Sequence, residues 1–450
     1  MKAGQLKKLF NKLIDLTKQI YLQEPPDNCV LPSRFLAGKR PRIFLGSLGL
    51  EWWVTKRAHK CCEEIADMAI SFEPQLQGGD RAEFCKIINT SLQENATNPK
   101  IFNVDSLVFR QVNNLFEARA VKEVRDFASS LWSEISENLI KSIADWMILY
   151  PLRQIKVQSF VLNFDGLSLL ASNDKNRWQE LSENYKVKTW DPSTGIWKDK
   201  SEKSSWKDFV FVPSWLVCEI SGTKSGARYI AGRRMRSFVA ILFSYLDKQY
   251  TGLLLKSGAD VASYSIQFPN KAAKINIRWE VASIGELLPP LLLNIGTQFI
   301  DVPDEAVSKV KNWYTQRSSV PELAQQRATT ASHFTHRAVM FDELDRFLYF
   351  FVTLDALFGE RHKVEKNIRE GIKRTFPNDS IWEKRIEEIF DLRNELVHGG
   401  ISSLSDWNRL DHYREYFQSH PLEDVKTAAM TALTTYFQYQ SYEVCDNDKQ

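Results

Sequence analysis

The stretch that carries the clearest structural signal reads IEEIFDLRNELVHGG and runs from Ile386 to Gly400. Its apolar residues recur at the three- and four-residue spacing of an amphipathic helix, which predicts a helix over residues 381–397 that packs in a helical bundle. Gly399 and Gly400 mark its expected end, because glycine accepts the left-handed conformation there at little cost. His398 is therefore expected in the last turn, where the negative end of the helix dipole favours its protonated form.

The end of this helix carries three polar side chains, those of Arg393, Asn394 and His398. At about 100° per residue, the side chains of Arg393 and His398 point about 140° apart. They can converge on one ligand only if the helix end distorts, or if a second chain supplies the facing copy. Asn394 offers both a donor and an acceptor. An Arg and a His at this spacing form a weak signal alone, and the adjacent Asn, the apolar helical frame and the Gly-Gly stop strengthen it.

The sequence on either side of this stretch predicts a multidomain α+β protein. From about residue 303 onward the pattern is helical without strands. The expected helices there cover 304–314, 321–336, 342–358, 364–375 and 427–439, besides 381–397. We expect an all-α bundle over residues 303–450, a mixed α/β domain over 151–302 and a mostly helical region over 1–150.

The N-terminal region shows helical spacing in three places. An amphipathic surface helix is expected within residues 1–22 and another helix over 52–70. A long helix is expected from about 115 to 149, ended by Pro151, because proline removes a backbone donor and clashes with the preceding turn. These residues show no pattern that indicates chemistry.

The middle domain combines strand patterns with one basic cluster. Strands are expected within 155–162, 209–212, 263–268 and 275–279, a polar loop over 173–207 and a helix over 233–246. The basic cluster lies beside the glycine-containing turn at 221–226 and consists of Lys224, Arg228, Arg233, Arg234 and Arg236. Glycine amides and a helix N-terminus suit phosphate or RNA binding, although the spacing is not that of a P-loop. The alternative is a flexible turn followed by a solvated helix face.

Composition excludes several classes of protein. The 450 residues carry 59 Lys and Arg against 56 Asp and Glu, a net charge of +3, which argues against a surface coated in basic residues for general nucleic-acid binding. The six cysteines include no C-x-x-C pair, so neither a disulfide scaffold nor a zinc site is expected. No apolar stretch is long enough to span a bilayer. We expect a cytoplasmic protein without a metal, a cofactor or a membrane partner.

Residues Arg393-Asn394-x-x-x-His398 resemble the Arg-Asn-x-x-x-His motif of HEPN domains. The preceding segment 347–359, FLYFFVTLDALFG, resembles a helix typical of the Apea-like HEPN group, and a helix like 367–372 follows before the motif. The resemblance covers about residues 303–440, roughly a third of the chain. One departure is Asp355, where the group usually has Glu, which leaves a supporting role for Asp355 in question.

The resemblance implies a helical bundle that forms a homodimer, with two Arg/His motifs facing a shared cleft. Active members are metal-independent endoribonucleases, many of them toxins or effectors of phage defence by abortive infection. RNA, with tRNA among the candidates, carries its own nucleophile in the 2′-hydroxyl. His398 would move a proton, Arg393 would hold the phosphate and Asn394 would orient either group.

Two non-catalytic interpretations remain at this point. In the first, Arg393 pairs with Asp391, Glu395 or Asp355 inside the bundle and His398 is only a cation that caps the helix. In the second, the domain is an inactive module for sensing, binding or dimerisation. If the domain is a nuclease, residues 1–302 are expected to sense a phage or nucleotide trigger, to restrain the nuclease or to select the RNA.

Overall fold

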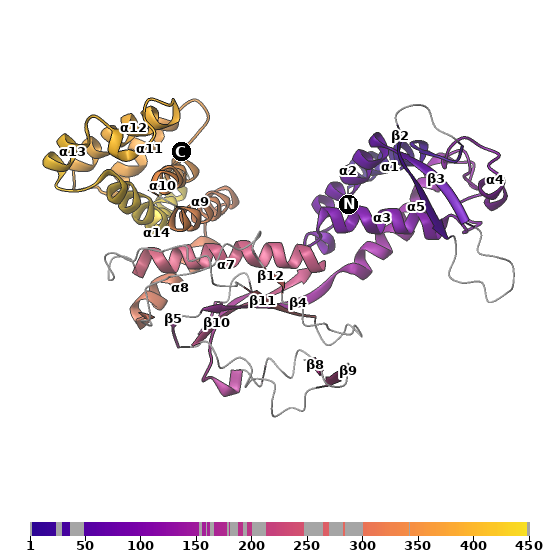
Figure 1. Cartoon of the computed structure of the whole chain (residues 1–450), viewed down its shortest axis with the longest axis horizontal. Coiled ribbons are helices and arrows are strands. Elements are labelled where there is room, and N and C mark those ends of the chain that lie inside the picture. The colour runs from indigo at the N-terminus through magenta and orange to yellow at the C-terminus, as the bar shows by residue number, and fades with distance from the viewer. Residues whose placement is uncertain are drawn as a thin grey trace. The chain divides into compact units, whose positions relative to one another are not determined.

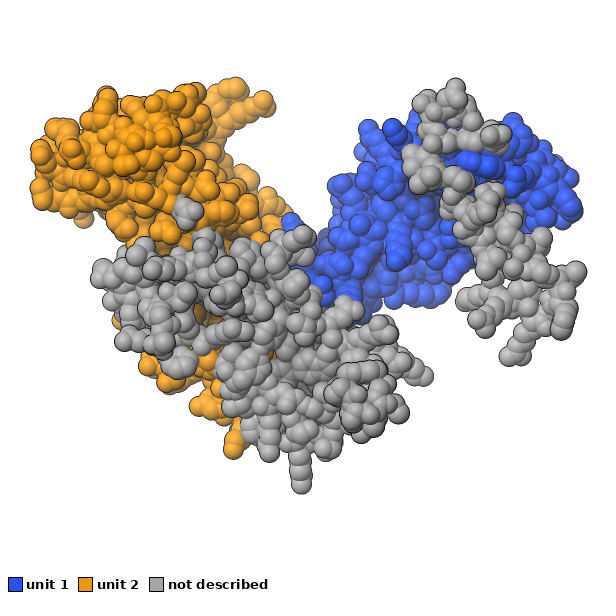
Figure 2. Space-filling view, in the orientation of Figure 1, with its two compact units in different colours: residues 1–146, 220–230 blue, residues 147–219, 231–450 orange. Residues whose placement is uncertain are grey.

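The structure is a computed structural model, and it describes most of the chain. The described residues are 2–23, 29–36, 49–152, 155–158, 160–162, 166–177, 180, 188–191, 196–199, 213–246, 264–269, 282–283, 300–341 and 343–447. The strands expected at 209–212 and 275–279 lie outside these residues, as does most of the loop expected over 173–207. The chain divides into two compact units, residues 1–146 with 220–230 and residues 147–219 with 231–450 (Figure 2).

The first unit packs helices beside a small antiparallel sheet (Figure 1). Its helices are α1 (Ala3–Lys18), α2 (Lys56–Phe72), α3 (Arg81–Asn95), α4 (Val104–Val108) and α5 (Val124–Ser142). The strands are β1 (Ile20–Tyr21), β2 (Cys29–Leu36) and β3 (Gly49–Thr55), in the order β1-β3-β2. The helix predicted within residues 1–22 is confirmed as α1.

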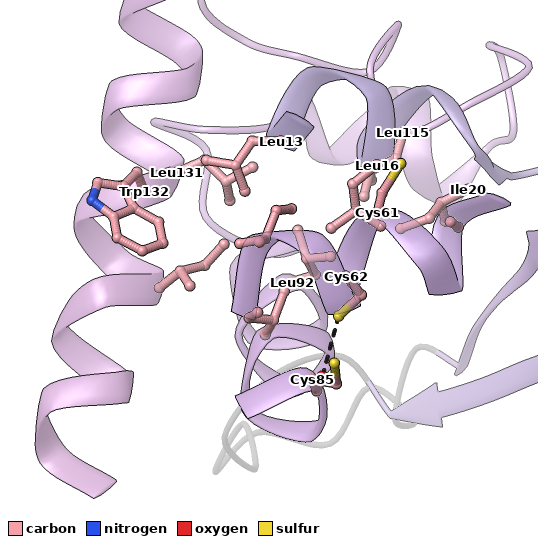
Figure 3. Close-up of a cluster of buried hydrophobic side chains, with 14 of the residues drawn as sticks. Leu13, Leu16, Ile20, Cys61, Cys62, Cys85, Leu92, Leu115, Leu131 and Trp132 are labelled. Atoms are coloured by element: carbon pink, nitrogen blue, oxygen red, sulfur yellow. Dashed lines mark hydrogen bonds between the residues drawn. The ribbon is translucent and has the colours of Figure 1, made fainter. Parts of the chain in front are cut away.

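The core of the first unit lies between α1, α2, α3 and α5, as Figure 3 shows. Leu13 and Leu16 of α1 are buried there with Leu92 of α3 and Leu131 of α5. Each helix places its apolar stripe inward, so the spacing of these residues in the sequence accounts for the packing.

Two predictions for the N-terminal region were wrong at their boundaries. The segment from Trp52 to Thr55 is the end of strand β3, and helix α2 begins only at Lys56, after the Thr55 hydroxyl caps the Ala58 amide at 3.0 Å. Tryptophan, valine and threonine favour strands when a neighbouring strand pairs with them, and here β3 lies between β1 and β2. The long helix expected over 115–149 is shorter, because α5 covers only Val124–Ser142.

A six-stranded sheet follows α5. Its strands, in spatial order, are β12 (Ala282–Ser283), β11 (Tyr264–Pro269), β4 (Ala144–Leu152), β10 (Ser214–Gly222), β7 (Leu167–Ala171) and β6 (Phe160–Val161). Pro151, expected to end a helix, lies inside strand β4. Two smaller pairs join β5 (Ile155–Lys156) to β13 (Ile300–Asp301) and β8 (Lys188–Asp191) to β9 (Ile196–Asp199). The second pair lies within the loop predicted over 173–207, so the prediction was wrong for these two strands, which pair with each other. Strands are thus present within 155–162 and at 263–268, as predicted.

Helix α7 (Lys224–Leu246) begins nine residues before the expected start at 233. Lys224 and Arg228 therefore lie on a helix and not in a flexible turn. The glycine-containing segment before them is the end of strand β10 and the beginning of α7, so the turn interpretation of this segment was wrong.

The C-terminal part consists of helices, as predicted, among the residues that the structure describes. They are α8 (Asp304–Ser318), α9 (Glu322–Met340), α10 (Glu343–Phe358), α11 (Val364–Thr375), α12 (Ile381–Val397), α13 (Leu410–Phe417) and α14 (Pro421–Asn447). The predicted ranges of α11 and α12 are confirmed. Helix α13 was not predicted, and α14 begins earlier than expected. The described residues are mostly helical with a small sheet, in agreement with an α+β class.

Helix α10 is the centre of this helical part. It packs against α9 and α14, and its Phe347, Phe350 and Leu354 are no more than 1% exposed. Within the described part of the chain, no helix has both the length and the apolar character needed to cross a membrane.

Candidate functional site

The candidate site lies where the last two turns of α12 meet α10. The rings of Phe351 in α10 and Phe390 in α12 pack edge to face with centroids 4.9 Å apart. Leu392, two residues farther along α12, is fully buried. These apolar contacts hold α12 against α10. They therefore fix the backbone positions of the polar residues that follow Leu392.

Arg393 is half-buried against α10. Its guanidinium carbon lies 5.6 Å from the centre of the Phe351 ring, within the range of a cation–π contact. Its Nη1 donates a hydrogen bond of 3.0 Å to Oδ1 of Asn394, which is exposed. The Phe351 ring and the Asn394 amide together restrict the Arg393 side chain, so its guanidinium has a defined orientation.

Asp355 is one turn beyond Phe351 on α10. Burial raises the pKa of its carboxyl group above the ordinary value, and the nearby Arg393 guanidinium partly opposes that rise. The two groups are thus electrostatic neighbours. Among the described residues, however, Arg393 forms no ion pair with a carboxylate, whether of Asp355, Asp391 or Glu395. Asp391 instead accepts a bond of 2.9 Å from Arg409.

The end of α12 is closed by backbone hydrogen bonds from two glycines. Gly399 has a φ of +76°, and its N–H donates to the carbonyl of Leu396 at 3.3 Å. The N–H of Gly400 donates to the carbonyl of Glu395 at 2.8 Å, which completes the two-bond pattern of a Schellman motif. The predicted glycine stop is confirmed, because only glycine takes this backbone conformation without strain.

His398 is the last residue before this turn. Its backbone N–H still donates to the carbonyl of Asn394 at 3.0 Å, so the helix stays regular up to this point. Its imidazole is exposed and has no hydrogen-bond partner among the described residues. Because the helix end is not distorted, the side chains of Arg393 and His398 diverge by about 140° within one chain.

Two residues near the site escaped the sequence analysis. Phe351 was expected only as an apolar residue of the helix over 342–358, although its ring contacts the guanidinium of Arg393. Gly359 donates its N–H to the carbonyl of Asp355 at 2.7 Å, and a methyl group at this position would lie under 3.0 Å from the Asp355 carboxylate. The signal for Gly359 was its place one turn after Asp355, where a larger residue would displace that side chain.

The amides of Thr223 and Ser225, where β10 ends and α7 begins, already donate hydrogen bonds within the protein. The amide of Thr223 donates to the carbonyl of Gly78 at 3.1 Å, and the hydroxyl of Ser225 donates to a carboxylate oxygen of Glu83 at 2.8 Å. The Ser225 amide donates to the same carboxylate. The anion at the N-terminus of α7 is therefore a side chain of the protein, which disfavours a phosphate site in this segment.

The basic cluster is spread around α7 and does not form one patch. Arg233 is exposed, whereas Arg236 is only 8% exposed. Lys224, Arg228 and Arg234 are half-buried. At about 100° per residue, Arg234 points roughly 160° away from Arg236. The five cations do not share a single contact surface.

The described residues contain no group of three or more His, Cys, Asp or Glu side chains that could hold a metal ion. Comparison with known proteins found no match for this chain among family models, curated proteins or solved structures.

Proposed function

We propose that the chain is a metal-independent endoribonuclease of the HEPN type, with Arg393, Asn394 and His398 as its catalytic residues. The observation that carries the proposal is a half-buried arginine without a carboxylate partner, close to an exposed histidine without a hydrogen-bond partner, among the described residues. A guanidinium in this state can bind a phosphate through paired hydrogen bonds. An accessible imidazole can exchange protons with a substrate.

The reaction needs no nucleophile from the protein. The 2′-oxygen of RNA attacks the adjacent phosphorus, a bond forms between them, and the bond from phosphorus to the 5′-oxygen breaks. One imidazole accepts the 2′-hydroxyl proton or donates a proton to the leaving 5′-oxygen. Arg393 stabilises the negative charge that develops on the phosphate oxygens. The products are a 2′,3′-cyclic phosphate and a 5′-hydroxyl end.

The site is complete only with a second copy of the chain. The regular end of α12 keeps Arg393 and His398 about 140° apart in one chain, so a facing α12 is needed to bring an arginine and a histidine to one phosphate. A two-fold axis near His398 would supply it and would give a homodimer. In this arrangement residues 1–302 restrain the nuclease, sense a trigger or select the RNA, as expected of an abortive-infection effector or a toxin.

The divergence of the two side chains also supports a second candidate. A chain that never pairs its α12 helices would be a catalytically inactive module for binding or dimerisation. Arg393 would then serve only to cover Phe351 and to orient Asn394.

Cleavage of total RNA by the purified full-length protein, with the His398→Ala variant beside it, separates the two candidates. We expect cleavage by the wild type in excess EDTA and none by His398→Ala, because the proton-transfer group is gone and an exposed side chain contributes little packing. His412→Ala is the matched control, since His412 is also exposed and lies on the neighbouring helix α13. Its activity should be unchanged.

The product ends give a second readout. A short defined RNA should yield 2′,3′-cyclic phosphate and 5′-hydroxyl ends, and a 2′-deoxy substitution at the cut position should block cleavage. DNA should not be cut. Full activity of a folded His398→Ala protein, or 5′-phosphate products, would contradict the proposed chemistry.

A further inference from the structure

The core of the first unit contains three cysteine side chains. Cys61 and Cys62 belong to α2, and Cys85 belongs to α3. They are 3%, 1% and 7% exposed, and all three are free thiols. Because α2 and α3 pack against each other, thiols from the two helices can meet inside the unit. None of them takes part in the proposed nuclease site.

Cys62 and Cys85 are in direct contact across the two helices, although they are 23 positions apart in the chain. The Cys62 thiol donates a weak hydrogen bond of 3.5 Å to the carbonyl oxygen of Cys85. Figure 3 shows both side chains between α2 and α3, with the sulfur atom of Cys62 directed toward Cys85. Cys61 points about 100° away on α2 and has Lys12 and Asp15 of α1 as electrostatic neighbours.

The two thiols of this contact differ in acidity. The interaction with Cys85, followed by burial, raises the pKa of the Cys62 thiol above its ordinary value. The same interaction lowers the pKa of Cys85, although burial and the carboxylates of Glu63 and Asp67 oppose that change. Cys85 therefore ionises first and Cys62 keeps its proton. Since the thiolate is the nucleophilic form of cysteine, Cys85 is the more reactive of the two.

Cys85 is also the more accessible thiol, because it lies in the second turn of α3 near the surface of the unit. Ala82, one turn earlier, and Lys86, the next residue, are both exposed. Cys62 is almost completely covered by comparison. A small uncharged oxidant arriving from solvent would therefore meet Cys85 first, with Cys62 directly behind it.

We propose that Cys62 and Cys85 form a redox-sensitive pair, which hydrogen peroxide converts to a disulfide between α2 and α3. The Cys85 thiolate attacks one peroxide oxygen, the O–O bond breaks, and Cys85 becomes a sulfenic acid. The leaving hydroxide takes up the proton that Cys85 had released. The Cys62 sulfur then attacks the Cys85 sulfur, the S–O bond breaks, and water leaves with the proton of the Cys62 thiol. The two thiols are oxidised, and the peroxide is reduced to two molecules of water.

Peptide mapping by mass spectrometry tests the proposal, which does not depend on the nuclease assignment. The folded full-length protein is treated with hydrogen peroxide, denatured, alkylated and digested. We expect a linked pair of peptides that contains Cys62 and Cys85, lighter by two hydrogen atoms than the separate peptides and released by dithiothreitol. Cys61→Ser is the matched control, because Cys61 is an equally buried neighbour on α2. This variant should form the same bond.

A second variant identifies the thiol that reacts first. In Cys62→Ser the sulfenic acid has no thiol partner, so dimedone should label Cys85 more strongly than in the wild type. In Cys85→Ser neither the bond nor that label should form at Cys62. If a serine variant fails to fold, the linkage found in the wild type decides the proposal.

Three results would overturn the proposal. The folded wild type could form no bond between Cys62 and Cys85 in excess peroxide, which would mean that these thiols only fill the core. Cys62 could be linked to Cys61 or to a cysteine elsewhere in the chain. Dimedone could label Cys62 in Cys85→Ser as strongly as it labels Cys85 in Cys62→Ser, which would contradict the assigned order of reaction.

Discussion

At the scale of single residues, the burial of His336 makes the free energy of unfolding depend on pH. Its pKa in the folded chain is lowered to about 3, below the ordinary value of about 6.5 that applies after unfolding. Between these two values the unfolded state binds more protons than the folded state. The free energy of unfolding must therefore fall as the pH falls through this window.

We expect this histidine to contribute a slope of up to about 1.4 kcal/mol per pH unit between pH 6 and 4 in a phosphate-free buffer. His336→Gln, which cannot be protonated, should flatten the dependence by that amount, as measured by urea denaturation at a series of pH values. The exposed His412→Gln serves as the control and should keep the wild-type slope. An unchanged slope in His336→Gln would mean that this ring is already charged or that it titrates normally in the folded protein.

At the scale of an element, the end of α12 depends on Gly399. Any other residue there must adopt a φ of +76°, which costs about 1 kcal/mol for a side chain with a Cβ. Gly399→Ala should lower the free energy of unfolding by about that amount and loosen the turn that holds His398. Gly400→Ala is the control, because its φ is not in the left-handed region and its Cβ would meet only atoms of Glu395, of which the carbonyl oxygen at 3.3 Å is the nearest.

Denaturant titration of both variants measures the difference. If the nuclease proposal is right, cleavage by Gly399→Ala should fall together with its stability, since His398 begins the same turn. Equal stability of Gly399→Ala and the wild type would show that this turn can change its conformation without cost.

A second element-scale feature joins α12, α13 and α14 through one buried carboxylate. Asp424 accepts hydrogen bonds from Arg385 at 3.1 Å, from the Tyr413 hydroxyl at 2.6 Å and from the Ser419 hydroxyl at 2.5 Å. Burial and this carboxylate also raise the pKa of Tyr413. The carboxylate is therefore the common acceptor that fixes the short helix α13 on its neighbours.

Asp424→Asn removes the charge that Arg385 faces, and we expect it to lower the free energy of unfolding by about 3 kcal/mol. Thermal and denaturant unfolding should agree on this loss. Glu423→Gln, one residue earlier, alters the ion pair between this exposed carboxylate and the partly buried Lys426 and should change stability by less than about 0.5 kcal/mol. Similar effects of the two changes would show that the buried network contributes no more than a surface pair.

At the scale of the whole molecule, the proposed composite site predicts complementation between two inactive variants. Arg393→Ala and His398→Ala should each be inactive alone. When the two are mixed and allowed to exchange subunits, heterodimers regain one arginine and one histidine across the interface, and we expect up to about a quarter of the wild-type activity. Cleavage of a fluorescent RNA measures the recovery, and mixing either variant with itself is the control. No recovery despite proven subunit exchange would refute a site shared between chains.

The residues of the candidate site could be predicted from the sequence because each depends on local structure. The apolar spacing of 381–397 predicts a helix, and two glycines predict its end, so the positions of Arg393 and His398 along that helix follow without tertiary information. Their angular separation follows from the helix repeat alone. The surroundings of Arg393 could not be predicted, because Phe351 and Asp355 lie on another helix.

The sequence by itself determined the helical character of α1 and of helices α8 to α12, because an amphipathic period of 3.6 residues persists whatever the helix packs against. Tertiary structure decided the rest. Residues 52–55 form a strand because β1 and β2 pair with β3. The Ser225 amide in the first turn of α7 donates to Glu83, which lies 142 positions away in the chain. Local propensity cannot specify such contacts, since their free energy arises only when distant surfaces meet.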